Sequence, residues 1–149
     1  MAKFIVTKEL GRLAKWLRIM GYDTIYFNKD EKRELVINSL REERIILTRD
    51  SRMSRYSGVK MIHIDTDFIE EQVKQVAREL KIKPDEEKLF SRCVICNEPL
   101  VKVEKETLKD KVAPYVYETQ QRFMNCPKCN RIYWQGTHCD NVKKVIEKL

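Results

Sequence analysis

Short apolar runs alternate with amphipathic segments through the first half of the chain. Each apolar run has the length of a buried strand, and between the runs apolar residues recur at helical spacing. The runs predict strands at residues 4–6, 24–27, 44–48 and 59–64. The amphipathic segments predict helices at about 9–20, 30–43 and 67–80. Strands that alternate with helices in this way form a parallel sheet with helices on both faces, so we expect an α/β fold.

The ends and the buried faces of the first two helices can also be predicted. Gly21 follows the first helix at the position of a C-terminal cap, and Asp30 precedes the second helix as an N-cap. The first helix is expected to bury Leu10, Leu13, Ala14 and Leu17. The second helix is expected to bury Leu35, Val36, Ser39 and Leu40.

The chain divides near Pro84. Residues 81–88 are strongly charged and contain this helix breaker, so we interpret them as a linker. The sequence therefore predicts two domains, an α/β domain over residues 1–84 and a smaller domain over residues 90–149.

The smaller domain contains two CxxC pairs, separated by residues 97–125. Each pair can form a tight turn that directs two thiolates at one ion, and zinc prefers four such ligands in a closed tetrahedron. The ligands that we predict for one structural Zn²⁺ in a zinc ribbon are Cys93, Cys96, Cys126 and Cys129. Reduced core cysteines or a redox pair are the alternatives. Outside this spacing, Cys139 is expected to be an unpaired thiol or to pack against Trp134, rather than to be a stray ligand beside His138.

The composition favours a globular protein with a polyanionic partner. The 149 residues are 42% apolar and 36% charged, and they carry a net charge of +7, which favours binding to nucleic acid. The N-terminus is interrupted by charge too soon for a signal peptide, and no apolar run approaches the roughly 18 residues of a membrane helix. We therefore expect a cytoplasmic protein without membrane association, in which CxxC pairs stay reduced and bind metal.

Acidic residues follow several of the strands, at the edge of the sheet where parallel α/β folds bind ligands. Clustered carboxylates supply the hard oxygen ligands that suit Mg²⁺ or Mn²⁺, and these ions assist phosphodiester cleavage. The alternative, that these residues only cap helices and turns, stays open on the pattern alone. The acids that could converge at this edge are Asp30, Glu31, Glu34, Asp50, Asp65 and Asp67.

The first predicted helix also has a basic side. Basic residues recur there at intervals of four, three and three, opposite the leucines, and Trp16 lies close enough to stack on a base. The pattern fits a surface that contacts phosphates, but it also fits a solvated helix face with Trp16 packed partly in the core. The basic residues are Lys8, Arg12, Lys15 and Arg18.

Several motifs, spread in one order over nearly the whole chain, are similar to those of a known family. In the first domain they are residues 10–18 (LGRLAKWLR), 21–23 (GYD) and 44–50 (RIILTRD). In the second domain they are residues 91–93 (SRC), 96–97 (CN), 126–129 (CPKC) and 133–138 (YWQGTH). Together these segments resemble the RNase domain found at the C-terminus of the Mut-seven exonuclease, a PIN-like nuclease domain followed by a zinc ribbon.

The resemblance implies a metal-dependent ribonuclease with a PIN-like sheet, whose zinc ribbon helps to grip RNA. Asp50, in the Leu-Thr-Arg-Asp motif, would be the principal catalytic acid and a ligand for Mg²⁺ or Mn²⁺. The assisting acids would be Asp65, Asp67 or Glu34. The cations that face RNA would be Arg12, Lys15, Arg18 and Arg49, and we expect Lys8, from the same basic side of the helix, to join them.

One departure from the family pattern matters most for the chemistry. Where the family usually has an aspartate after the first strand, this chain has Thr7, which is a neutral and poor metal ligand. Lys32 and Arg33 crowd the expected position of a second acid, which Glu31 or Glu34 could replace. We therefore expect either a weakened ribonuclease or a non-catalytic module that binds RNA, the ribosome or another ribonucleoprotein. A protein-interaction adaptor that docks through the ribbon is a third hypothesis.

Overall fold

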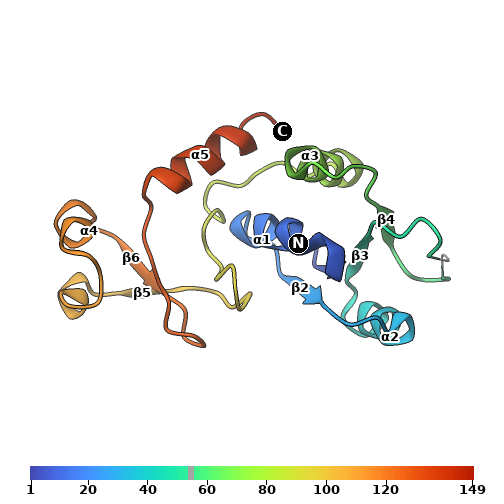
Figure 1. Cartoon of the computed structure of the whole chain (residues 1–149), viewed down its shortest axis with the longest axis horizontal. Coiled ribbons are helices and arrows are strands. Elements are labelled where there is room, and N and C mark those ends of the chain that lie inside the picture. Colours follow the sequence, from blue (N-terminus) through green and yellow to red (C-terminus); the bar gives the residue numbers. More distant parts are fainter. Residues whose placement is uncertain (54–55) are drawn as a thin grey trace.

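Two sheets of different kinds form the framework of the protein. The structure is a computed structural model that describes residues 1–53 and 56–149. Figure 1 shows the α/β part at one end of the molecule and an antiparallel ribbon at the other, with the last helix lying above both. Within the described residues, no helix combines the length and the apolar character needed to traverse a bilayer.

The larger sheet has four parallel strands in the order β2-β1-β3-β4. The strands are β1 (Phe4–Thr7), β2 (Thr24–Phe27), β3 (Ile45–Thr48) and β4 (Met61–His63). All four lie where the apolar runs predicted them, although β4 is shorter than the predicted 59–64. The central strands β1 and β3 pair with Phe4 opposite Ile45 and Val6 opposite Leu47, and these four residues are buried.

Helices cover both faces of this sheet, which confirms the predicted α/β fold. They are α1 (Gly11–Ile19), α2 (Lys32–Glu42) and α3 (Ile69–Leu80), with a 3-10 turn, η1 (Lys8–Leu10), before α1. Side chains of successive residues in β1 point to opposite faces. Phe4 and Val6 therefore pack in a cluster with α1 and α3, whereas Ile5 packs in a second cluster with α2.

Helix α2 differs from its prediction at its start and on its buried face. The helix begins at Lys32, and the carboxylate of Asp30 pairs with Lys8 instead of capping the helix. Leu35 is buried as predicted, but Leu40 is 48% exposed. At 100° per residue Leu40 lies about 140° around the helix from Leu35, beyond the stripe that faces the sheet.

The prediction of a C-terminal cap at Gly21 is confirmed. The residue has a φ of +92°, and its N–H donates to the carbonyl of Arg18. The next N–H, of Tyr22, donates to the carbonyl of Leu17, as in a Schellman cap. A Cβ at position 21 would lie 2.5 Å from the carbonyl oxygen of Lys88, so the segment after α3 returns to pack on the end of α1.

The second sheet is an antiparallel ribbon in the order β5-β6-β7. Its elements are β5 (Val101–Val103), η2 (Lys105–Leu108), α4 (Pro114–Thr119), β6 (Phe123–Asn125) and β7 (Ile132–Tyr133). A small apolar cluster of Leu108, Val116 and Phe123 supports it. The sheet and the cysteines beside it fit the predicted zinc ribbon.

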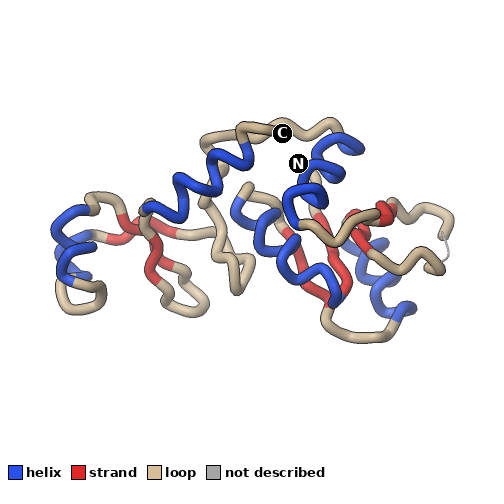
Figure 2. The backbone as a smooth tube through the Cα atoms, turned by 45° about the horizontal axis from the view of Figure 1, so that its top comes forward, coloured by secondary structure: helices blue, strands red, loops and turns tan. Residues whose placement is uncertain are grey.

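The last helix, α5 (Thr137–Ile146), joins the two ends of the molecule. Figures 1 and 2 both show it running from the ribbon back toward the α/β part. Its residues Val142 and Ile146 are buried in the same cluster as α1 and α3, together with Leu89. The segment after residue 89 therefore contributes to the core of the α/β part as well as to its own.

Candidate functional site

The two CxxC pairs form two turns with the same hydrogen bonds. In the first turn, the N–H of Asn97 donates to the carbonyl of Cys93 at 2.9 Å, and in the second the N–H of Asn130 donates to that of Cys126 at 2.8 Å. The two asparagines have φ values of +66° and +62°, a left-handed conformation that asparagine tolerates better than most residues. Two turns of different composition thus have one geometry, which is typical of paired metal knuckles.

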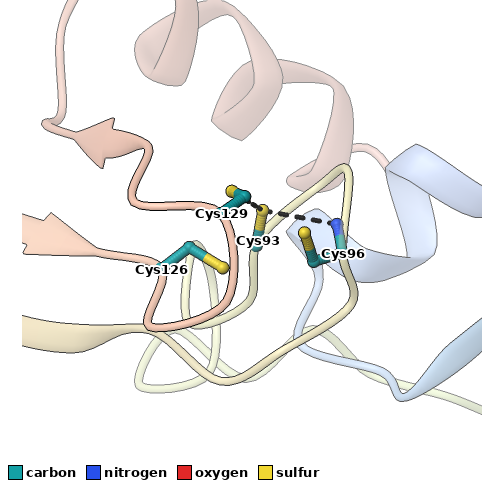
Figure 3. A group of neighbouring side chains, drawn as sticks. All are labelled: Cys93, Cys96, Cys126 and Cys129. Atoms are coloured by element: carbon teal, nitrogen blue, oxygen red, sulfur yellow. Dashed lines mark hydrogen bonds between the residues drawn. The ribbon is translucent and has the colours of Figure 1, made fainter.

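The turns bring four sulfur atoms together (Figure 3). All four Sγ atoms lie within 4.8 Å of one another, and those of Cys93 and Cys129 are 3.8 Å apart. A tetrahedral zinc ion with Zn–S bonds of 2.3 Å places its sulfur ligands about 3.8 Å apart. The four predicted cysteines therefore fit a closed site for a structural metal ion, and they are consistent with zinc.

Neighbouring groups lower the pKa of two of these cysteines, Cys93 and Cys129, whereas burial and the neighbouring thiols raise the pKa of Cys96. Burial raises the pKa of Cys129, but the backbone N–H and guanidinium of Arg131 outweigh it and lower this pKa to about 6. The hydroxyl of Tyr133 lies 3.0 Å from the sulfur of Cys93, and burial together with this contact raises the tyrosine pKa. The fifth cysteine, Cys139, lies outside the cluster, with its thiol 3.8 Å from the carbonyl oxygen of Trp134.

Arg18 connects helix α1 to the first knuckle. Its Nε donates to the carbonyl of Thr24 at 3.0 Å, and its Nη1 donates to those of Val94 at 2.8 Å and Ile95 at 3.2 Å. The residue is only 8% exposed. The prediction that Arg18 faces RNA is therefore wrong, because the carbonyls of the knuckle need donors and this side of α1 supplies them.

A second polar link joins the sheet to the same knuckle. The carboxylate of Asp23 accepts hydrogen bonds from Nη1 of Arg44 at 2.9 Å and from Nδ2 of Asn97 at 2.6 Å. The side-chain oxygen of Asn97 accepts the N–H of Thr24 at 2.9 Å. Burial acts to raise the pKa of Asp23, but the bonds from Arg44 and Asn97 hold it below its ordinary value.

A cleft of about 450 Å³ opens where β1, β2 and β3 end. This is the edge at which parallel α/β sheets bind ligands. The residues around it include acids and bases in similar numbers. The acids are Glu9, Asp30, Glu31 and Asp50, and the bases are Lys8, Lys29, Lys32, Arg49 and Arg52.

Glu9 is a cleft residue that the sequence pattern did not identify. Its Oε1 accepts hydrogen bonds from the hydroxyl of Thr7 and from the N–H of Arg49 at 3.2 Å, with the hydroxyl of Thr48 at 3.5 Å. Partial desolvation acts to raise its pKa, but these bonds lower it overall. Glu9 thus places an ionised carboxylate just beyond Thr7. The sequence contains one signal for this role, because Glu9 is the first acidic residue after the strand predicted at residues 4–6.

Asp50 occupies the predicted place at the end of β3. Its Oδ1 accepts the N–H of Arg52 at 3.0 Å, and its Oδ2 lies 3.3 Å from Nζ of Lys32. Its own N–H donates to the hydroxyl of Thr48 at 3.1 Å. The bond from the backbone of Arg52 and the charge of Lys32 lower the pKa of Asp50. Glu9 therefore contacts Thr48 and Arg49, the two residues that directly precede Asp50.

The other acids predicted to assist Asp50 do not join it. Asp65 and Asp67 are exposed beyond the edge strand β4, and Asp67 pairs with Arg49 at 2.8 Å. Glu34 lies in the first turn of α2 and pairs with Lys29 at 3.0 Å. None of these three lines the cleft. Within the described residues, the cysteine cluster is the one group of three or more metal-ligating side chains close enough to hold an ion, so the predicted convergence of the four acids is not found.

The remaining members of the predicted basic face are exposed. Lys8 reaches the cleft, and Arg12 and Lys15 follow it on the surface of α1. Trp16 is half-buried, with one side against the core that α1 shares with α3. The basic stripe therefore begins at the cleft and leads along α1 toward the ribbon.

Comparison with known proteins identifies one family. The model of the Mut7-C RNAse domain family matches residues 2–146. The match spans both sheets, the cleft and the cysteine cluster. Searches of the curated proteins and of the solved structures gave no significant match.

Proposed function

Because this chain belongs to the Mut7-C RNAse domain family, we propose that it hydrolyses phosphodiester bonds of RNA at the cleft beyond β1 and β3. One observation carries the proposal: Glu9 and Asp50, both with lowered pKa, follow the ends of two adjacent parallel strands and line the same cleft. With the bases around them they suit a polyanionic substrate. In this proposal, residues 1–84 form a PIN-like nuclease core, and residues 90–149 form a ribbon that helps to hold RNA.

Glu9 and Asp50 are the residues that would hold a catalytic Mg²⁺ or Mn²⁺. Mg²⁺ in proteins is commonly bound by one or two carboxylates and keeps several water ligands, so a pair of acids is sufficient. When bound, such an ion activates water and offsets the charge that develops on the phosphate. The hydroxyl of Thr7, which donates to Glu9, orients that carboxylate rather than serving as a ligand itself.

Bases on the rim are suited to hold the substrate phosphate. Lys32 and Arg52 pair with Asp50, and both must turn away when this carboxylate binds a cation. Their side chains are 56% and 89% exposed, so each pair is a weak surface ion pair that exchanges readily. Once released, these cations and Lys8 neutralise the backbone charge of bound RNA.

The decisive experiment compares RNA hydrolysis by the wild type and by acid-to-amide variants. With Mn²⁺ or Mg²⁺ present, Asp50→Asn and Glu9→Gln should each lower kcat/KM by about 100-fold, as expected when a charge that stabilises the transition state is lost. Asp65→Asn is the matched control, because it removes an exposed carboxylate outside the cleft. Equal rates for the wild type and Asp50→Asn would remove Asp50 from the mechanism.

Non-catalytic binding of RNA, alone or within a ribosome or other ribonucleoprotein, is the second candidate function. It is favoured by the neutral Thr7 at the end of β1 and by the two cations that neutralise Asp50. It predicts RNA affinity that falls steeply with salt and no cleavage with any divalent metal. Hydrolysis that appears only in Thr7→Asp would support this function for the natural chain.

A further inference from the structure

A second hollow lies away from the cleft, between α1 and the ribbon. It is a groove of about 890 Å³, nearly twice the volume of the cleft. Its walls are α1 on one side and α4, β7 and the start of α5 on the other. The groove is therefore formed only when the ribbon packs beside α1, and neither part contains it alone.

Aromatic side chains are concentrated in this groove. Trp134 is 36% exposed and Tyr115 is 71% exposed, so both rings are accessible to a ligand. Exposed aromatic faces are the surfaces on which unpaired bases stack, and stacking is tolerant of base identity because every base has a π-face. The aromatic residues that line the groove are Trp16, Phe90, Tyr115, Tyr133 and Trp134.

The charge of the groove is complementary to a nucleic acid backbone. Arg12 and Lys15 lie on its α1 wall, and both are exposed. All the residues that line the groove belong to the described part of the chain, and none of them is acidic, although the protein contains 23 Asp and Glu residues. A groove for an acidic or mixed-charge peptide would not need stacking surfaces, whereas single-stranded RNA uses both features.

We propose that this groove binds a single-stranded segment of RNA, with bases stacked on Trp134 and Tyr115 and phosphates facing Arg12 and Lys15. The inference rests on the proposed function, since it assigns the groove to the same RNA that enters the cleft. Lys8 lines the cleft and Lys15 lines the groove, about 10 Å further along the same side of the helical segment. The bound strand therefore extends from the scissile site to the ribbon.

Binding is measured with a fluorescein-labelled oligouridylate of about 10 nucleotides, a length within the range of single-stranded sites. All proteins carry Asp50→Asn and no Mg²⁺ or Mn²⁺ is added, so that binding is measured without cleavage. Tyr115→Ala should weaken binding about ten-fold, the usual effect of removing one stacking partner. Phe68→Ala, which removes a 74% exposed aromatic side chain outside the groove, should bind like the parent.

The cations are tested in the same way. Replacing both Arg12 and Lys15 by glutamine should lower the slope of log affinity against log salt by about 1.4, at about 0.7 for each lost phosphate contact to a single strand. Arg78→Gln on α3 is a control for loss of charge outside the groove. Equal binding by Tyr115→Ala and Phe68→Ala, or equal affinity for a duplex of the same length, would overturn the proposal.

Tryptophan fluorescence provides a direct readout of stacking. The chain has two tryptophans, so Trp16→Phe leaves Trp134 as the only one. Stacking of a base should quench the emission of Trp134 when the oligouridylate is added, and binding without quenching would contradict the assignment.

The tests separate the two proposals, the groove and the hydrolase. If groove variants weaken binding but the protein with Asp50 intact cleaves no RNA, the groove is supported and the hydrolase is contradicted. Asp50-dependent cleavage together with groove variants that bind like the parent would do the reverse.

Discussion

Asp23 links three parts of the molecule through one carboxylate. It accepts hydrogen bonds from Arg44, next to β3, and from Asn97, in the first knuckle. The side chain of Arg44 is only 7% exposed, so its guanidinium depends on the acceptors that surround it. Removing Asp23 therefore leaves a buried cation with fewer partners and removes one of the bonds that join the knuckle to the sheet.

Asp23→Ala should lower the free energy of unfolding by about 2 kcal/mol, the usual cost of losing hydrogen bonds to a charged group. In the folded state the pKa of Asp23 is lowered, because the bonds from Arg44 and Asn97 outweigh the opposing effect of burial. Its contribution is therefore complete above the unfolded pKa of about 3.9 and is lost only as the pH falls through the folded value. The difference in free energy of unfolding between the wild type and Asp23→Ala, measured by urea denaturation, should therefore be constant across neutral pH. Asp110→Ala, an exposed site, is the control and should change stability by less than about 0.5 kcal/mol.

The position of Glu9 shows why part of the cleft was not predictable from sequence. The leucine spacing predicted a helix from residue 9, in which Glu9 would be an ordinary first-turn acid. The structure has the 3-10 turn η1 there, which directs Glu9 toward the end of β3. Its partners Thr48 and Arg49 are about 40 residues away, and only the parallel pairing of β1 with β3 brings them close. Asp50 was predictable because it directly follows its strand.

At the scale of elements, helix α1 has three different sides. One side is apolar and faces the core, and a second carries Arg12 and Lys15 on the surface. The third side carries Arg18, which belongs to the basic stripe in sequence but faces the knuckle. Periodicity predicted the apolar face because core packing has the period of the helix. It could not separate Arg18 from the exposed bases, since the knuckle that Arg18 contacts lies 76 residues away.

Gly21→Ala should destabilise the protein more than Gly58→Ala does. Both glycines have positive φ, so alanine is strained at either position. At Gly21 the added Cβ would also meet the backbone carbonyl of Lys88 at 2.5 Å, whereas at Gly58 the nearest atom, from Leu40, lies at 3.7 Å. Overpacking of this kind adds at least about 1 kcal/mol, so the two variants should differ by that amount in thermal or urea denaturation. Equal losses would mean that the segment around Lys88 adjusts freely.

At the scale of the whole molecule, the cysteine cluster is attached to the α/β part by side chains from both. Arg18, in α1, donates to the carbonyl of Val94 in the first knuckle. In the opposite direction, Arg92 beside the knuckle donates to the carbonyl of Gly21, after α1, at 3.3 Å. Helix α5 then returns from the ribbon and buries Val142 and Ile146 beside α1. The predicted boundary near Pro84 followed a change of composition, and composition carries no information about which distant segments pack together. A metal ion in the ribbon should therefore influence the stability of the sheet.

Removal of the metal should loosen strand β2 as well as unfold the ribbon. A small ribbon of this kind obtains much of its folding free energy from its metal, so a chelator should abolish the knuckles. The N–H of Thr24, in β2, donates to the side chain of Asn97 and loses this acceptor when the first knuckle opens. Hydrogen exchange with and without chelator should then show faster exchange at Thr24. The N–H of Ile45, which donates to the carbonyl of Lys3 inside the sheet, should keep its protection and is the internal control.

If Thr24 were equally protected in both states while the ribbon amides exchanged freely, the two parts would be independent, and the groove between them would not be a fixed site. Faster exchange at Thr24, with Ile45 still protected, would mean that the metal holds the first knuckle against the sheet, and a strand of RNA that spans the cleft and the groove requires this arrangement.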